Sequence, residues 1–226
     1  MNILVIGNEA NRVEMAQKFG SQHSYALAKN LAEQKPILEW AEVIFDFVSA
    51  SAAHTLVIYD KVLVPVFLDT TFTSLATVLN TAKIKKQIIG FCGLPTFAGR
   101  DVLEVCIVSE NDYQTLKEAC EALNTKFSLV QDQTGFVTPR IICMIINEAY
   151  FTVAEGTATR QDIDLAMKLG TNYPFGPFEW GARIGVQNVV KILDAVYQTS
   201  ANERYKVCSL MREEGELVNL PLNEGG

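Results

Sequence analysis

The sequence predicts an α/β domain built on a mostly parallel sheet, followed by an all-α domain. The chain begins with an apolar run, a glycine and a helix-spaced segment, which is how a nucleotide-binding βα unit starts. Apolar runs then alternate with helical segments up to residue 132, as in a parallel sheet with both faces covered. After Gly135 nearly every segment has helical spacing. We therefore expect domains at 1–134 and 135–226.

The elements of the first domain follow from hydrophobic periodicity. The run NILVI at 2–6 predicts a buried strand that stops at Gly7, and apolar residues at helical intervals predict a helix over 9–19. Short apolar runs bounded by polar or turn residues predict further strands. These strands are expected at 24–28, 41–48, 62–69, 86–94, 101–109 and 126–132, with a helix at 111–123.

The second domain is expected to consist of helices. The segment 137–155 is apolar nearly all round, so the helix it predicts must be buried, with cover from a partner subunit or from the first domain. A short helix is expected at 160–169, and the sequence YPFGPF should interrupt the helical structure after it. Two more helices are expected at 185–199 and 203–214.

Composition excludes several classes of function. With a net charge of −7 and a pI near 4.9, the chain lacks the basic surface that nucleic-acid binding needs. Its apolar runs are shorter than the about 20 residues of a membrane-spanning helix. Five cysteines without CxxC spacing, and a first segment without signal-peptide features, predict reduced thiols and a cytoplasmic protein. No residues have metal-ligand spacing, so no metal site is expected.

A set of motifs in the second domain points to one family. It comprises Gly135–Phe136, Arg140, the run NEA at 147–149, DIDLAMKLG at 162–170 and YPFGPFEW at 173–180. With this set the chain resembles the 3-hydroxyacyl-CoA dehydrogenase family over most of its second domain. The first domain resembles a shortened dinucleotide-binding domain of the same family.

The resemblance implies a Rossmann-like N-terminal domain and an all-α C-terminal dimerisation domain of the 6-phosphogluconate dehydrogenase C-terminal-domain-like class. It implies hydride transfer between NAD and the 3-hydroxyl group of an acyl-CoA. It also implies a homodimer formed through the helical domain.

The turn that should hold the cofactor departs from the GxGxxG pattern, in which glycines let the backbone approach the pyrophosphate. Only the first glycine, Gly7, is present; Glu9 and Arg12 replace the other two. A carboxylate at Glu9 is expected to repel the pyrophosphate by a few kcal/mol, on the order of two or three decades in affinity. Arg12 could bind a phosphate in compensation. NAD is thus the cofactor implied by resemblance, at a turn that fits it poorly.

The catalytic positions depart from the family in the same way. The family uses a histidine as acid or base, a glutamate that orients it, and a serine and an asparagine that bind the substrate oxygen. An ungapped count places the glutamate at Glu104, the histidine at Cys92 and the serine at Thr71, and the asparagine falls at Pro139. A neutral thiol has a pKa near 8.5 and is a poor base at neutral pH, and Glu104 should raise that pKa further.

Three functional hypotheses remain open. The chain is a 3-hydroxyacyl-CoA dehydrogenase-like protein whose catalysis is weak or lost and which binds acyl-CoA or another subunit, an active enzyme with altered machinery, or a purely structural dimer. Arg100, in the loop that faces the substrate in the family, is a candidate to bind a CoA phosphate or carboxylate. The residues alone leave open whether the protein is an enzyme.

Overall fold

The computed structural model describes residues 1–31 and 35–217, which fall into two compact units divided between Phe136 and Val137. The division lies two residues beyond the boundary expected from the sequence. The last part of the expected second domain, after Leu217, lies outside the described residues.

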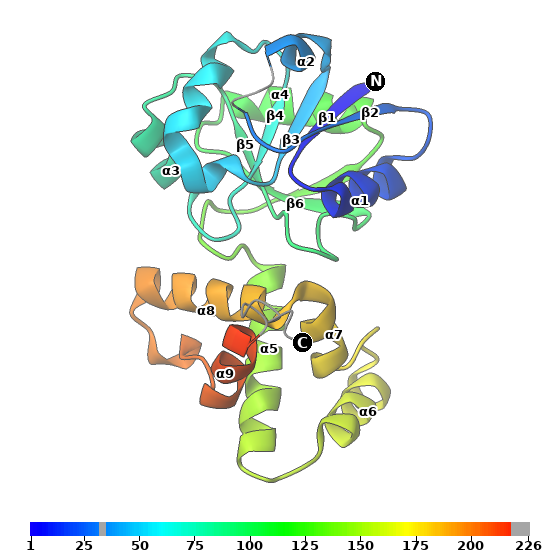
Figure 1. Ribbon diagram of the computed structural model, residues 1–226, viewed down its shortest axis with the longest axis vertical. Helices are drawn as coiled ribbons and strands as arrows, with labels where there is room; N and C mark the ends of the chain where they lie inside the picture. Colours follow the sequence, from blue (N-terminus) through cyan, green and yellow to red (C-terminus); the bar gives the residue numbers. More distant parts are fainter. Residues whose placement is uncertain (32–34, 218–226) are drawn as a thin grey trace, which may run out of the picture. The chain divides into compact units, whose positions relative to one another are not determined.

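The first unit is a seven-stranded sheet with helices on both faces (Figure 1). The strands follow the order β2-β1-β3-β4-β5-β6-β7, and all neighbours are parallel except β5 and β6. The elements are β1 (Asn2–Ile6), α1 (Glu9–Phe19), β2 (Ser24–Ala28), α2 (Lys35–Trp40), β3 (Val43–Asp46), η1 (Ser49–Lys61), β4 (Val66–Asp69), α3 (Leu75–Ala82), β5 (Ile89–Phe91), β6 (Val102–Cys106), α4 (Asp112–Ala122) and β7 (Lys126–Leu129). The mostly parallel sheet predicted from the alternating apolar runs is confirmed.

The two faces of this sheet bury alternate side chains of the same strands, as a period of two requires. One face packs its core residues, including Val5, Phe45 and Phe67, against α1 and α4. The rings of Phe45 and Phe67 stack at 4.7 Å between centroids. On the other face, segment η1 contributes the buried Leu56 and Tyr59 and packs against β4 and α3. Burial on both faces explains why the strands read as unbroken apolar runs.

The strands end earlier than the apolar runs do, and the helical segments α2, η1 and α3 that separate them were expected without bounds of their own. At the end of β3, Asp46 is fully buried, and its Oδ1 accepts hydrogen bonds from the backbone amides of Val48 and Ser49. Its Oδ2 accepts from the hydroxyl of Tyr59 at 2.7 Å. The carboxylate therefore ends the strand and fixes the first turn of η1.

Helix α3 begins where a distant carboxylate accepts its first amides. Leu75 N and Ala76 N donate to Asp132 Oδ1 and Oδ2 at 2.7 and 2.8 Å. A carboxylate at a helix N-terminus satisfies otherwise unpaired amides and interacts favourably with the helix dipole. Asp132 thus ties the segment after β7 to the helix after β4.

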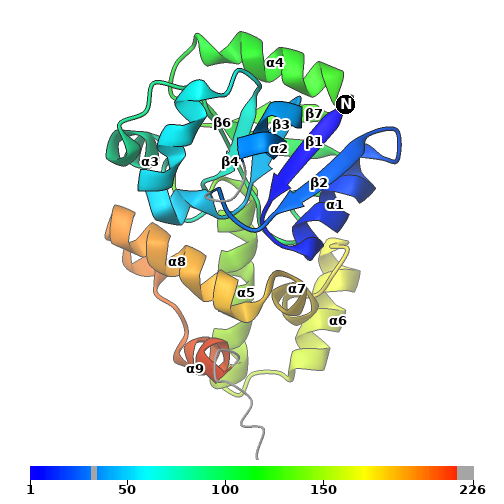
Figure 2. The ribbon, with the colours of Figure 1, turned by 45° about the horizontal axis from the view of Figure 1, so that its top comes forward.

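The second unit is helical, with α5 (Thr138–Ala154) running through its middle (Figure 2). Around it lie α6 (Arg160–Thr171), α7 (Pro177–Ile184), α8 (Val186–Ser200), η2 (Glu203–Tyr205) and α9 (Ser209–Leu217). Within the single chain α5 is not covered all round, since Ile141 is 53% exposed and Phe151 36% exposed. Cover for these side chains from a partner subunit stays a prediction. Within 1–31 and 35–217, no helix has the length and apolar character to cross a membrane.

Helix α7 lies where the sequence predicted only a break, and the family motif explains it. Asp164 accepts hydrogen bonds from Phe178 N at 2.8 Å and Glu179 N at 3.1 Å, so it caps α7 from α6. A Cβ on Gly176 would lie 2.3 Å from Asp164 Cγ, so this position needs glycine to admit the carboxylate. Lys168 adds an ion pair to Glu179 at 2.6 Å. The DIDLAMK and YPFGPFE segments are thus one structural unit.

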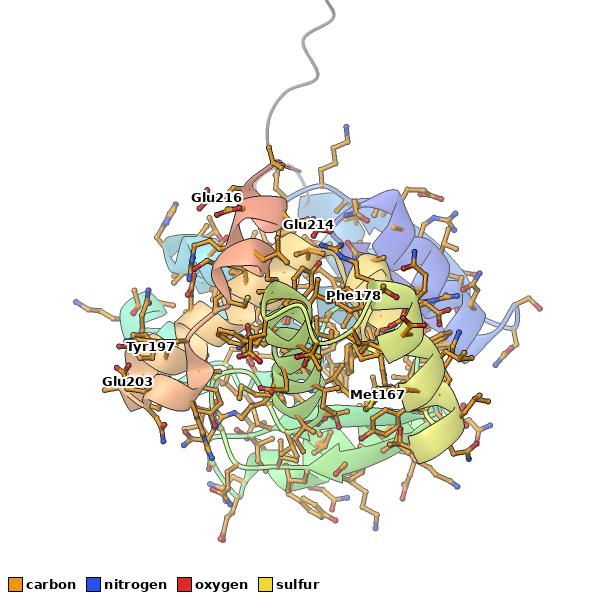
Figure 3. All side chains as sticks on the ribbon, turned by 90° about the horizontal axis from the view of Figure 1, so that it is seen from below. Met167, Phe178, Tyr197, Glu203, Glu214 and Glu216 are labelled. Atoms are coloured by element: carbon orange, nitrogen blue, oxygen red, sulfur yellow. The ribbon has the colours of Figure 1, made fainter. Side chains whose placement is uncertain are left out.

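Two polar contacts hold the C-terminal part of this unit to α5 and α6. Asn147, buried in α5, donates to Lys206 O and accepts from Cys208 N, both at 2.8 Å. The guanidinium of Arg160 binds Glu214 through two hydrogen bonds and lies 5.0 Å from the ring centroid of Phe178. Figure 3 labels Glu214 and Phe178.

The Asp132 contact can be tested by removing the carboxylate. In Asp132→Ala the two amides of α3 lose their acceptors, so the free energy of unfolding of the first unit should fall by ~1–2 kcal/mol. Urea unfolding followed by fluorescence measures it, because Trp40 lies in the first unit and Trp180 in the second. Glu110→Ala, an exposed acid of the same unit, is the control and should leave the midpoint unchanged. Equal midpoints for both variants would contradict the cap.

The steric requirement at Gly176 has a matched control in the same unit. Gly176→Ala places a methyl group against Asp164 and should lower the free energy of unfolding of the second unit by ~1–3 kcal/mol. A Cβ on Gly170, inside α6, would meet nothing within 4 Å. Gly170→Ala should therefore stabilise the unit by up to ~1 kcal/mol through helix propensity. The fluorescence of buried Trp180 reports both, and a neutral Gly176→Ala would show that the contact relaxes freely.

Candidate functional site

Three of the predicted catalytic positions meet at the ends of neighbouring strands of the first unit. Thr71 follows β4, Cys92 follows β5 and Glu104 lies in β6. Because β5 and β6 are antiparallel, Cys92 and Glu104 stand directly opposite each other, and Cys92 N donates to Glu104 O at 3.1 Å. Thr71 is fully buried, and its Oγ1 accepts a hydrogen bond from Gly93 N at 3.2 Å.

A fourth residue of this cluster, Asp69, was missed from the sequence. Asp69 ends β4, and its Oδ1 accepts from the backbone amides of Thr71 and Gly93, both at 3.0 Å, and from the Thr71 hydroxyl. A Cβ on Gly93 would lie 2.5 Å from Asp69 Cγ, so glycine there admits the carboxylate. The available signal was a single acid at the carboxyl end of an apolar strand, the edge of a parallel sheet where ligands bind.

The electrostatics of the cluster favour a neutral thiol. Cys92 is 3% exposed, and burial raises its pKa well above its ordinary value. The nearby Asp69 carboxylate raises it further, and Glu104 contributes least. The sequence argument named only Glu104, so it identified the direction of the shift but a minor cause. Burial also raises the pKa of Asp69, against the lowering effect of its hydrogen bonds.

The hydrogen bonds of Asp69 and Thr71 join the ends of neighbouring strands and do not position a group for proton transfer. The Asp69 carboxylate is engaged by three donors of the chain itself, and the adjacent Gly135 N donates to Thr71 O at 2.8 Å. The only two histidines of the chain lie elsewhere: His23 Nδ1 is 3.2 Å from the N-terminal amine, and His54 is exposed in η1. In the described part of the chain, no three side chains could hold a metal ion together.

Pro139 lies on the second unit, buried in the first turn of α5. Proline suits this place, because its missing amide would have no partner in a first turn and its φ is already helical. The position expected to bind the substrate oxygen therefore carries no hydrogen-bond donor, and it has a structural use instead.

The turn at Gly7 is closed by its own side chains. Asn8 caps α1: its Oδ1 accepts from Asn11 N, and Asn8 N donates to Asn11 Oδ1, both at 3.0 Å. A Cβ on Gly7 would lie 2.6 Å from Asn11 Oδ1, so the retained glycine is explained by this contact.

The two replacements of glycine in this turn neutralise each other. Arg12 Nε donates to both oxygens of Glu9 at 3.0 Å, and its terminal nitrogen forms an ion pair with the same carboxylate. This hydrogen-bonded pairing lowers the pKa of Glu9 and raises that of Arg12. After β2, where a carboxylate would bind the adenosine ribose, the exposed Lys29 and Asn30 follow. The residues of this turn do not fit a dinucleotide.

Arg100, the candidate for CoA binding, borders a groove of about 480 Å³ between α1 and the loop after β5. Its guanidinium lies 4.5 Å from the ring centroid of Phe97. Glu14 and Lys18 of α1 hold this loop, since Gly99 N donates to Glu14 Oε1 at 2.9 Å and Lys18 donates to Arg100 O. Burial raises the pKa of Glu14 and lowers that of Lys18.

Comparison with known proteins identifies relatives of both units. Residues 135–225 match the family model of the 3-hydroxyacyl-CoA dehydrogenase C-terminal domain. The 3-hydroxyadipyl-CoA dehydrogenase of Escherichia coli K12 is 43% identical over 88 residues, which cover 39% of this chain and 18% of that protein. The 3-hydroxybutyryl-CoA dehydrogenase of Clostridioides difficile is 30% identical over 146 residues, covering 63% of this chain and 52% of that protein.

The chain spans about half the length of these curated relatives, or less. A solved structure, the (S)-3-hydroxybutyryl-CoA dehydrogenase PaaH1 from Ralstonia eutropha, shares the fold with a TM-score of 0.73 at 19% identity, covering 96% of this chain and 94% of that one. The motifs at 135–180, the matching family model and these relatives agree. These findings support membership of the chain in the 3-hydroxyacyl-CoA dehydrogenase family, whose C-terminal domain residues 135–225 match.

Proposed function

We propose that this chain is a 3-hydroxyacyl-CoA dehydrogenase-like protein in which the family reaction, NAD-linked oxidation of a 3-hydroxyacyl-CoA, is weak or lost. The observation that carries the proposal is the state of Cys92. It stands at the family's histidine position as a buried thiol, opposite Glu104, with a pKa well above its ordinary value.

The missing acid or base determines how much the reaction rate is expected to fall. A thiol in this environment stays protonated at neutral pH, so it cannot accept the proton that leaves a 3-hydroxyl group. Loss of a positioned acid or base costs about two to four decades in rate. Pro139 removes a second contribution, because its side chain offers no hydrogen bond to the substrate oxygen.

Binding of acyl-CoA does not depend on these two positions, and it is the alternative function that the first unit supports. The groove is lined by Arg100 and Lys18, whose cationic groups suit a phosphate or a carboxylate, and also by the acid Glu14. The five cysteines are buried and unpaired, which favours a reducing compartment such as the cytoplasm.

The proposal predicts slow turnover. With NAD and 3-hydroxybutyryl-CoA as substrates, the protein should turn over ~10²–10⁴-fold more slowly than the Clostridioides difficile 3-hydroxybutyryl-CoA dehydrogenase in the same assay. Production of NADH, followed by absorbance, measures the rate. Iodoacetamide at neutral pH should leave Cys92 unmodified in the native protein and label it in urea. Turnover within tenfold of the comparison enzyme would refute the proposal.

We further propose that the helical unit forms a homodimer. None of the side chains of α6 is buried, and its Leu165 and Leu169 are 54% and 78% exposed. Ile141 and Phe151 of α5 are exposed as well, so the unit presents several large apolar side chains to its surroundings. A second copy of the same unit offers a matching apolar surface, as a two-fold interface requires.

The dimer can be tested with charged substitutions on α6. The variant Leu165→Glu, Leu169→Glu should be a monomer by size-exclusion chromatography with light scattering, because a desolvated carboxylate opposes apolar contact. Leu63→Glu is the control, since Leu63 is 96% exposed and lies on the first unit. It should keep the mass of the wild-type protein. A monomeric wild type, or a dimer that survives both α6 substitutions, would exclude this interface.

A further inference from the structure

At the start of α1, side chains of the turn accept hydrogen bonds from its backbone amides. In a dinucleotide-binding turn, such amides donate to a phosphate. We infer that the Asn8–Asn11 pair closes the turn Gly7–Arg12 to a dinucleotide, so that the first unit does not hold NAD there. This goes beyond the proposed loss of the acid or base, because it would hold even in a chain whose catalytic histidine was restored.

The inference rests first on which amides are engaged. A pyrophosphate binds at a helix N-terminus through backbone amides of the turn and of the first helical residues. In this chain Asn8 N donates to Asn11 Oδ1 and Asn11 N donates to Asn8 Oδ1, each at 3.0 Å. A phosphate that bound these two amides would have to break both bonds, and the displaced side-chain oxygens would then need new partners.

The second support is steric. The contact of 2.6 Å between a notional Cβ on Gly7 and Asn11 Oδ1 shows that the Asn11 side chain fills the space beside Gly7. In the GxGxxG pattern the first glycine makes the tight turn, and the second lets the backbone approach the pyrophosphate. Here the Asn11 side chain fills the space inside the tight turn, and Glu9 places a side chain at the position of the second glycine.

The third support separates this closure from the effect of charge. The sequence suggested that Glu9 excludes the pyrophosphate by repulsion, but Glu9 is exposed and paired with Arg12. An exposed, neutralised carboxylate repels weakly, since solvent and its partner screen it. The same pairing engages Arg12, which was the cation that could have compensated. The neutral Asn8–Asn11 pair is therefore the closing element.

The experiment compares an open variant with a charge variant. Asn8→Gly, Asn11→Ala removes both side-chain acceptors, and glycine is a tolerated cap residue, so α1 should still form. Glu9→Gln removes the charge and leaves the Asn8–Asn11 pair intact. NADH is titrated into each protein by calorimetry, without acyl-CoA, after circular dichroism has confirmed the fold.

Wild type and Glu9→Gln are expected to show no saturable NADH binding at millimolar ligand, and the open variant should gain at least tenfold in affinity. Micromolar binding by the wild type would overturn the inference. So would a gain in Glu9→Gln without one in the open variant, or an open variant that folds and gains nothing.

Hydrogen exchange in the wild-type protein gives a test that needs no substitution. The amides of Asn8 and Asn11 should exchange slowly, because both are hydrogen-bonded, and their rates should not change when millimolar NADH is added. NADH-dependent protection of these amides would overturn the inference. NADH binding without turnover would overturn this inference alone and leave the proposed loss of catalysis standing.

Discussion

The structure depends throughout on one requirement: backbone amides at the starts of helices and the ends of strands need an oxygen acceptor. This chain supplies that acceptor from side chains. Asp132 serves α3 and Asp164 serves α7, each from a segment more than ten residues away in sequence. Asp46 and Asp69 do the same for the segments that follow β3 and β4. Each acceptor fixes a turn, and the fixed turns set the positions of the residues expected to carry chemistry.

The same requirement explains why the candidate site is poorly arranged for catalysis. A catalytic carboxylate needs a free oxygen and a proton that can move. One oxygen of Asp69 accepts three donors that hold the ends of β4 and β5 together, and the thiol of Cys92 beside it is buried and protonated. The hydrogen bonds that make this edge of the sheet rigid thus use the groups that proton transfer would need. In an active relative, a histidine at the position of Cys92 would add an acid or base without drawing on them.

Much of the fold could be predicted because periodicity is local. Apolar runs identified the strands, and the motifs at 135–180 identified the family and the helical unit. Helix α7 was missed because Gly176 and Pro177 suggested a break, whereas they begin the helix and make room for Asp164. Asp69 and Asp132 were missed because their roles come from contacts that form only in the folded chain. The pairing of Glu9 with Arg12 was missed for the same reason, since it depends on the helical conformation.

Different physical requirements determine two sets of residues in this chain: the motifs that identify the family, and the residues that would carry out its chemistry. Asp164, Gly176 and Glu179 are fixed by the geometry of α7 alone, because the carboxylate of Asp164 must reach two amides and a Cβ at 176 would block it. No ligand enters that argument, so these residues would be required in a member that had lost its reaction. In the turn at Gly7, by contrast, the second glycine of the pattern serves a ligand, and without a ligand the turn can be capped by its own side chains, as Asn8 and Asn11 do. A strong sequence match in the helical unit therefore indicates that the fold is kept. Whether the first unit can still accommodate a dinucleotide depends on which groups accept the backbone amides of the turn at Gly7.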